Sequence, residues 1–391
     1  MNHGRTEIIL QICAKTIYPI PVFVCSESAV PKKKIDIFLI LPIAAILFLG
    51  LLSLSSALIS KFYIQLIWVV LATAVFIFVS YSDLRLFERA AIPMYFANVI
   101  LLALVLLIGK TSGGAQRWLD IGFMNFQVSE LTKISVILFI AYQFNLKPTL
   151  EDGYNLVDIL PEAFGIFIPV FLIYKEPDLG TAILVGAISC AMILSTKINR
   201  KWLIGVLLFI IVSVPILWMW GLHDYQKTRV ISLVTMLLGE ESQELSQTSQ
   251  YHIKQSIIAV GSGRLHGKGY NRGTQNMLRF IPEHHTDFIF SVYAEEFGFF
   301  GVLLLLFLYF LLLVRILLLV GKVKDKFSAL ILVGSCAHIW LQVLVNIGMV
   351  TGILPVVGIP LPWFSYGGSS LIFNMLLMGL VHNVSLHRSY S

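Results

Sequence analysis

The sequence predicts an all-α polytopic membrane protein with about ten transmembrane helices, and three observations lead to this fold class. Of the 391 residues, 57% are hydrophobic and 13% are charged, about half the charged share of a soluble protein. The hydrophobic residues form runs long enough to cross a bilayer. The cations gather between those runs, so the net charge of +6 indicates contact with anionic membrane lipids, and we expect no nucleic-acid partner.

The chain divides into a short extension and a membrane domain. Residues 1–34 hold two short apolar runs broken by prolines and lack the order of a signal peptide, so we interpret them as a cytoplasmic N-terminal extension. In the membrane domain, 35–391, residues 221–287 form a large extracytoplasmic loop between the seventh and eighth helices. The predicted spans are 36–57, 63–81, 91–109, 127–144, 158–174, 180–196, 202–219, 288–314, 328–350 and 369–386.

Basic residues in the short joints set the orientation of these spans. The joints on one side of the membrane hold most of the lysines and arginines, beginning with the run at 32–34. Such joints face the cytoplasm, which places both termini there. The loop 221–287 then faces outward, and Asp287, at its end, lies at the outer membrane boundary.

Two polar clusters precede and begin the fourth span. Residues 113–120 include Arg117 and Trp118, which could serve a substrate or could simply anchor the segment at headgroup level. Glu130 and Lys133 lie three residues apart on one helix face and can pair. A charge at the bilayer centre costs about 2.5–3.5 kcal/mol on insertion scales, so this pair is a functional candidate, although a structural pair near the interface competes with it.

Two outward joints have unusual composition. In the turn 175–181, Asp178 could belong to a site or could cap the helix that follows, and alone it indicates little. The joint 346–370 is too rich in proline and glycine to be a continuous helix. At membrane depth such a segment must be re-entrant or line a cavity.

The long loop ends in the strongest candidate site. The glycines of 261–269 could bring backbone N–H groups to a phosphate, flanked by Arg264 and Lys268, although the spacing is not that of a P-loop. Asp287 could cap the helix that begins after it. The same position would favour an ionised carboxylate that acts as a base.

We infer no metal site and no disulfide from the sequence. The histidines His284 and His285 have no third ligand at suitable spacing. The cysteines have neither CxxC spacing nor a nearby histidine set, and they are Cys13, Cys25, Cys190 and Cys336.

At these segments the chain resembles the SEDS (shape, elongation, division and sporulation) family of polytopic peptidoglycan glycosyltransferases, and its elongation branch more than its division branch. The resemblance covers nearly everything after residue 35. One departure is Val128, where the family usually has proline, which bears on how the fourth helix starts. The matching motifs, in family order, are GAQRWLD, QVSELTK, EPDLGT, YHIKQSIIAVGSGRLHGKGY, GTQ, PEHHTDFIFSVYAEEFG and NIGMVTGILPVVGIPLPWFSYGGSS.

The resemblance implies a function and a set of partners. A SEDS protein polymerises lipid II into β-1,4 glycan strands on the outer face of the bacterial cytoplasmic (inner) membrane, for cell-wall elongation and cell shape, and releases undecaprenyl pyrophosphate. By resemblance, Asp287 matches the essential aspartate, and Glu130 and Lys133 match an important charged pair. The implied partners are a class B penicillin-binding protein, which is a transpeptidase, and other elongation-complex proteins.

We hypothesise that Asp287 is the general base that takes the proton from the acceptor 4-hydroxyl. Developing charge on the pyrophosphate needs cations. A divalent ion, Mg²⁺ or Mn²⁺, could share that role, and no motif requires one or any other cofactor. The candidate substrate-binding residues are Arg117, Glu130, Lys133, Asp178, Arg264 and Lys268.

Two other functions compete with the enzyme hypothesis. A flippase or transporter of lipid-linked precursors would also need many spans and buried charges, but it should need charges reachable from both faces. A non-catalytic scaffold of the elongation complex would tolerate Asp287→Ala, whereas a glycosyltransferase should fold and lose polymer synthesis.

Overall fold

The computed structural model describes most of the membrane domain. A compact unit begins at Ile35. The predicted extension 1–34 and all but two residues of the predicted span 202–219 lie outside the described residues. The described residues are 35–112, 115–120, 122, 125–148, 153–199, 205, 219, 224–238, 247–274 and 285–387.

The described part is predominantly helical, as predicted. Seven of its helices are long and apolar enough to cross a membrane: α2 (Ile37–Ala57), α3 (Ile59–Tyr81), α4 (Leu84–Ile108), α6 (Leu156–Lys175), α12 (Ile289–Val320), α13 (Lys326–Val350) and α14 (Gly368–Leu386). Two more helices match predicted spans, α5 (Val128–Leu146) and α7 (Leu179–Ser195). The count of ten stays a prediction, because the seventh predicted span lies outside the described residues.

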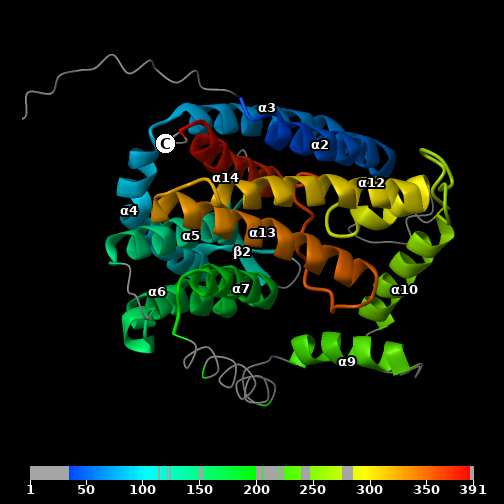
Figure 1. The fold of residues 1–391 in the computed structure, drawn as a ribbon. Helices are drawn as coiled ribbons and strands as arrows, with labels where there is room; N and C mark the ends of the chain where they lie inside the picture. The colour runs from blue at the N-terminus through cyan, green and yellow to red at the C-terminus, as the bar shows by residue number, and fades with distance from the viewer. Residues whose placement is uncertain are drawn as a thin grey trace, which may run out of the picture. The chain divides into compact units, whose positions relative to one another are not determined.

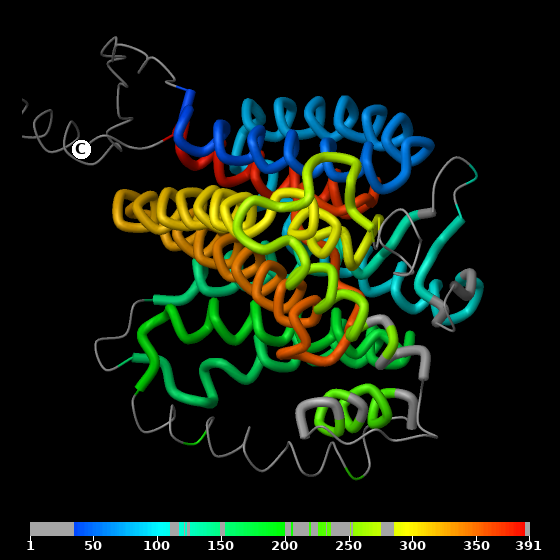
Figure 2. Tube along the Cα trace, turned by 90° about the vertical axis from the view of Figure 1, so that its right-hand side faces the viewer, coloured from blue at the N-terminus to red at the C-terminus, as the bar shows by residue number. Residues whose placement is uncertain are grey.

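The helices pack in three groups. Figures 1 and 2 show α12 and α13 running between α2, α3 and α14 on one side and α5, α6 and α7 on the other. Helix α14 packs on α3, α12 on α2, and α13 on both α5 and α7. Most side chains of α5 are buried among these neighbours, which explains how a helix with an internal ion pair can lie at this depth.

A small sheet, which the sequence analysis did not predict, lies between α4 and α5. Its antiparallel strands are β1 (Lys110–Ser112), β2 (Ala115–Asp120) and β3 (Asn125–Gln127), in that order. Pairing satisfies the backbone groups of a segment too short and polar to continue either helix. Helix α5 begins directly after β3, with Val128 as its first residue, the position where proline is favoured in helices.

The predicted outer loop contains two helices, α9 (Asp224–Leu238) and α10 (Gln247–Ser262). Helix α10 contacts α12 and α13. The turn that follows α10 packs against a break in α12 at Gly298, whose φ of 65° and ψ of −163° are accessible to glycine alone. Backbone N–H groups of this turn bond to carbonyls at the break: Lys268 N to Glu295 O at 3.0 Å, and Gly269 N to Glu296 O at 3.0 Å.

We expect Gly298→Ala to prevent normal folding. A β-carbon at this position would lie 2.2 Å from the backbone nitrogen of Gly267, and the backbone conformation would be strained as well. Gly261→Ala is the matched control, because a β-carbon there meets no atom within 4 Å. Size-exclusion profiles and melting temperatures in detergent would check this, with Gly261→Ala equal to wild type. A wild-type yield of folded Gly298→Ala would contradict the expectation.

Candidate functional site

Asp287 lies in the turn that leads into α12. The N-cap residue of α12 is Phe288, whose side chain makes no capping hydrogen bond, and Asp287 lies one residue before it. Its carboxylate is half-buried and lies against Gly358, where an added β-carbon would be 3.2 Å from Oδ2 of Asp287. The turn is also held by Tyr366, whose backbone N donates to the carbonyl of His285 at 3.1 Å.

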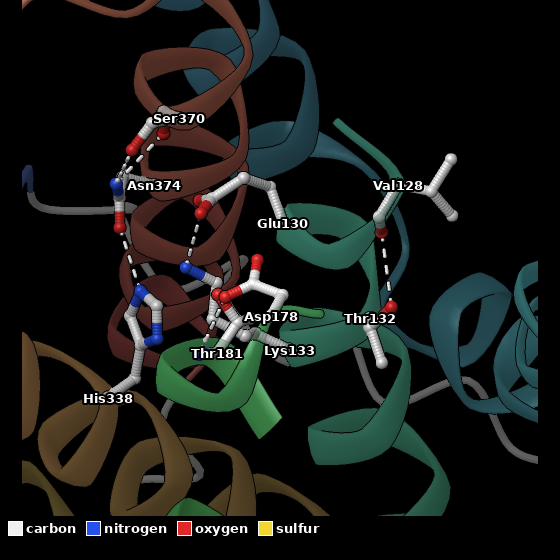
Figure 3. Close-up of polar contacts among 9 residues, drawn as sticks. All are labelled: Val128, Glu130, Thr132, Lys133, Asp178, Thr181, His338, Ser370 and Asn374. Atoms are coloured by element: carbon white, nitrogen blue, oxygen red, sulfur yellow. Dashed lines mark hydrogen bonds and ion pairs between the residues drawn. The ribbon is translucent and has the colours of Figure 1, made fainter. Parts of the chain in front are cut away.

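The predicted pair of Glu130 and Lys133 forms within α5. Lys133 Nζ lies 2.7 Å from Glu130 Oε1, and the two residues are only 2% and 3% exposed. Figure 3 shows the pair beside His338 of α13, whose ring bonds to Asn374 of α14 at 2.8 Å. A buried ion pair among three helices is a costly arrangement, which supports a functional role.

Arg117 and Asp178 meet although they are far apart in the sequence. Arg117 extends from β2, and its Nε lies 3.7 Å from Asp178 Oδ2, while its Nη2 donates to the carbonyl of Pro177 at 2.7 Å. Asp178 also caps α7 as predicted, accepting from Thr181 N at 3.2 Å. The Arg117 side chain remains 24% exposed, although its Nε is buried.

The segment between α13 and α14 connects these parts. As predicted, it is not a continuous helix. Val357 packs against Gly180, next to the Arg117–Asp178 contact, and the following residue, Gly358, packs against Asp287. Two adjacent residues of this segment therefore contact the Asp178 turn and the Asp287 turn.

The glycine-rich run 261–269 uses several of its backbone N–H groups within the protein. The N–H groups of Lys268 and Gly269 are used by the carbonyls at the break in α12. The Lys268 ammonium lies 2.6 Å from Oε1 of Glu295, which is fully buried. Glu295 is not among the site residues predicted from the sequence, although a glutamate inside an apolar helix signals a paired charge. Arg264, by contrast, is exposed.

Glu176, beside Asp178, is a further group that the sequence analysis missed. It is fully buried, and within the described part of the chain neither carboxylate oxygen has a hydrogen-bond partner. The pKa of Glu176 is raised to about 8, chiefly by burial and also by the charge of Asp178, while Arg117 acts to lower it. Glu176 is therefore mostly a neutral acid at pH 7.

The Glu176 carboxyl predicts a pH dependence of stability. Its pKa rises from 4.5 to about 8 on folding, so folding takes up a proton between these values. The free energy of unfolding is therefore highest below pH 4.5, where Glu176 is protonated in both states, and it falls as the pH rises towards 8. Glu176→Gln stays neutral, so its melting temperature should match wild type near pH 4.5 and exceed it by several degrees at pH 8. A difference in melting temperature between Glu176→Gln and wild type that stays constant from pH 5 to 8 would contradict the raised pKa.

Among the described residues, no group of three or more His, Cys, Asp or Glu side chains is placed to hold a metal ion. The residues that do converge are charged side chains and peptide groups from several elements. They form two adjacent sites, one around Asp287 and one around Arg117 and Asp178, with the Glu130–Lys133 pair in the helix that follows β3. Such a set of cations and carboxylates can bind an anion and move a proton.

Comparisons with known proteins agree with one another. The family model FTSW_RODA_SPOVE, described as a cell cycle protein, matches residues 34–390. The peptidoglycan glycosyltransferase MrdB of Escherichia coli (strain K12) is 45% identical over 309 residues, which are 78% of this chain and 80% of that protein. MrdB of Helicobacter pylori (strain J99) is 36% identical over 352 residues, 89% of this chain and 88% of that one.

Solved structures show the same fold. A chain in the structure described as "Structural coordination of polymerization and crosslinking by a peptidoglycan synthase complex" matches with a TM-score of 0.77 at 31% identity, covering 91% of this chain and 99% of that one. The rod shape determining protein RodA of Thermus thermophilus matches with a TM-score of 0.67 at 30% identity, covering 91% and 98%.

Proposed function

The chain belongs to the FTSW_RODA_SPOVE family and is a peptidoglycan glycosyltransferase, and we propose that it polymerises lipid II with Asp287 as general base. One observation carries the assignment of the base. Asp287 is a half-buried carboxylate held in a turn outside the α12 cap, against a glycine and next to a second charged turn. The position of this carboxylate beside the Asp178 turn supports Asp287 as the base.

In the proposed reaction, Asp287 takes the proton of the acceptor 4-hydroxyl as that oxygen attacks the anomeric carbon of the lipid-linked donor. The bond from that carbon to the pyrophosphate oxygen breaks, undecaprenyl pyrophosphate leaves, and the α-linked donor becomes a β-1,4 product. Direct displacement accounts for the inversion. The proton must leave Asp287 before the next cycle.

Cations near the site would stabilise the departing pyrophosphate. Within the predicted set, Arg264 is exposed and the Arg117 side chain is 24% exposed. Lys133 and Lys268 already pair with buried glutamates, so each would have to contact the substrate and its glutamate at the same time. Asp178 holds Arg117 and thereby contributes to the same subsite. A divalent ion, if present, would add charge to the pyrophosphate in the same place.

The proposal also concerns location and partners. The apolar helices and the family support a multi-pass protein of the bacterial inner membrane. We propose that both termini are cytoplasmic and that Asp287 faces outward, from the distribution of basic residues. The partner is proposed to be a class B penicillin-binding protein, supported by the likeness to a chain of a complex that couples polymerization and crosslinking.

The test is glycan-strand formation from purified lipid II by this protein reconstituted with its transpeptidase partner. We expect glycan polymer when this protein is present and none when it is left out. No polymer from the folded, reconstituted pair would reject the lipid II assignment and favour the transporter or the scaffold. A cysteine-labelling map of the 32–34 run and of the 221–287 loop would check the orientation independently.

A further inference from the structure

Asn346 of α13 joins the Asp287 turn to the segment that faces it. Its Nδ2 donates one hydrogen bond to the backbone carbonyl of Asp287 at 3.0 Å and another to the carbonyl of Ile359 at 2.7 Å. The residue is completely buried. Both protons of one rigid carboxamide are thus committed to two chain segments that are about 70 residues apart in the sequence.

This link determines where the Asp287 carboxylate lies. Ile359 directly follows Gly358, where an added β-carbon would lie 3.2 Å from Asp287 Oδ2. Gly358 has a φ of 75°, so it packs there without a β-carbon and in a conformation that suits glycine. By holding the carbonyls of Asp287 and Ile359 together, Asn346 sets the separation of the carboxylate and Gly358.

The geometry of a base matters because it must reach the proton it takes to about 2.6–3.2 Å. A displacement of about 1 Å at a reacting group can reduce the rate about 10²-fold. The turn has another support, the backbone bond from Tyr366 to His285, but that bond acts two residues before Asp287. Asn346 acts on the Asp287 peptide itself.

We infer that Asn346 is a positioning residue for Asp287, whose carboxamide fixes the catalytic turn to the Gly358 segment so that the carboxylate is aligned with the acceptor hydroxyl. This inference rests on the proposed function, because it assumes that Asp287 is the base. Asn346 touches neither reacting atom. Its removal should therefore lower kcat and leave the KM for lipid II nearly unchanged.

The chain supplies a matched control in Asn383 of α14. It is also completely buried, and its Nδ2 donates to two backbone carbonyls, those of Val79 at 2.8 Å and Ser82 at 2.6 Å. In the described part of the chain, the Oδ1 atoms of both asparagines lack a hydrogen-bond partner. Asn383 holds the end of α3, which is not part of the site. The two carboxamides are alike in their burial and in donating to two backbone carbonyls, and they hold different segments.

The experiment compares Asn346→Ala with Asn383→Ala in the reconstituted lipid II assay at matched folded amounts. Both variants should lose similar melting temperature, because each removes two hydrogen bonds from a buried carboxamide to backbone carbonyls. Asn346→Ala should lower kcat about 10–100-fold with KM within about twofold, and Asn383→Ala should keep the wild-type kcat. If Asn346→Ala yields no folded protein, Asn346→Ser, which keeps one donor, replaces it under the same criteria.

Two further variants separate this inference from the proposed function. If Asp287→Asn polymerises lipid II as wild type does, the proposed base is wrong whatever Asn346 does. If Asp287→Asn is inactive and Asn346→Ala keeps its kcat, or loses no more than Asn383→Ala, the positioning role is overturned. In the Asp287→Asn background, Asn346→Ala should cause no further loss of the residual rate. An additional loss of the same size as in wild type would show that Asn346 acts elsewhere, and would also overturn the inference.

Discussion

Asp287→Asn should fold as wild type does and polymerise lipid II about 10²–10⁴-fold more slowly. The amide has nearly the same shape as the carboxylate, so its packing against Gly358 and the backbone bond from Asn346 should persist. It cannot accept the proton of the acceptor hydroxyl at neutral pH. The loss should therefore fall on kcat, while the melting temperature stays close to wild type.

A second aspartate makes a suitable control for this result. Asp325 caps α13, and its carboxylate accepts from Ser328 N at 2.8 Å. Asp325→Asn changes the same functional group at a helix start without touching the site, so glycan synthesis should be unaffected at matched folded amounts. Equal polymer yields from Asp287→Asn and Asp325→Asn would reject Asp287 as the base.

Lys133→Met should strongly destabilise the protein. It removes the cation from Glu130 and leaves a carboxylate that is 3% exposed. Breaking a buried pair by removing one partner typically costs about 3–5 kcal/mol. The expected result is a lower melting temperature and a smaller folded fraction in detergent. A melting temperature equal to wild type would show that Glu130 finds another partner or is neutral without Lys133.

The double variant Glu130→Gln/Lys133→Met separates stability from function. It removes both charges, so it should recover much of the stability that Lys133→Met loses. Polymerisation should stay low, because we propose that the pair serves the substrate. The control is Glu162→Gln/Lys147→Met, which removes the 2.6 Å pair at the other end of α5. Full polymerisation activity of Glu130→Gln/Lys133→Met would show that the Glu130–Lys133 pair has a purely structural role.

The sequence by itself determined most of the helical framework and the contacts made within single elements. Apolar runs placed the described spans to within a few residues, apart from the start of α4 at Leu84 rather than near 91 and the end of α12 at Val320 rather than near 314. The pairing of Glu130 with Lys133 followed from their three-residue spacing, and the capping by Asp178 followed from its place before α7. These features depend on neighbours along the chain, so a local pattern contains the information they need.

Only the tertiary structure decided which distant groups meet. Lys268, a candidate for binding phosphate, pairs with the buried Glu295, and the backbone of the same turn bonds to the break in α12. The burial of Glu176 depends on elements packed around its turn. The contact of Gly358 with Asp287 joins residues that no local period relates. Each of these features depends on burial and on partners that are distant in the sequence. Both arise only when the helices have packed.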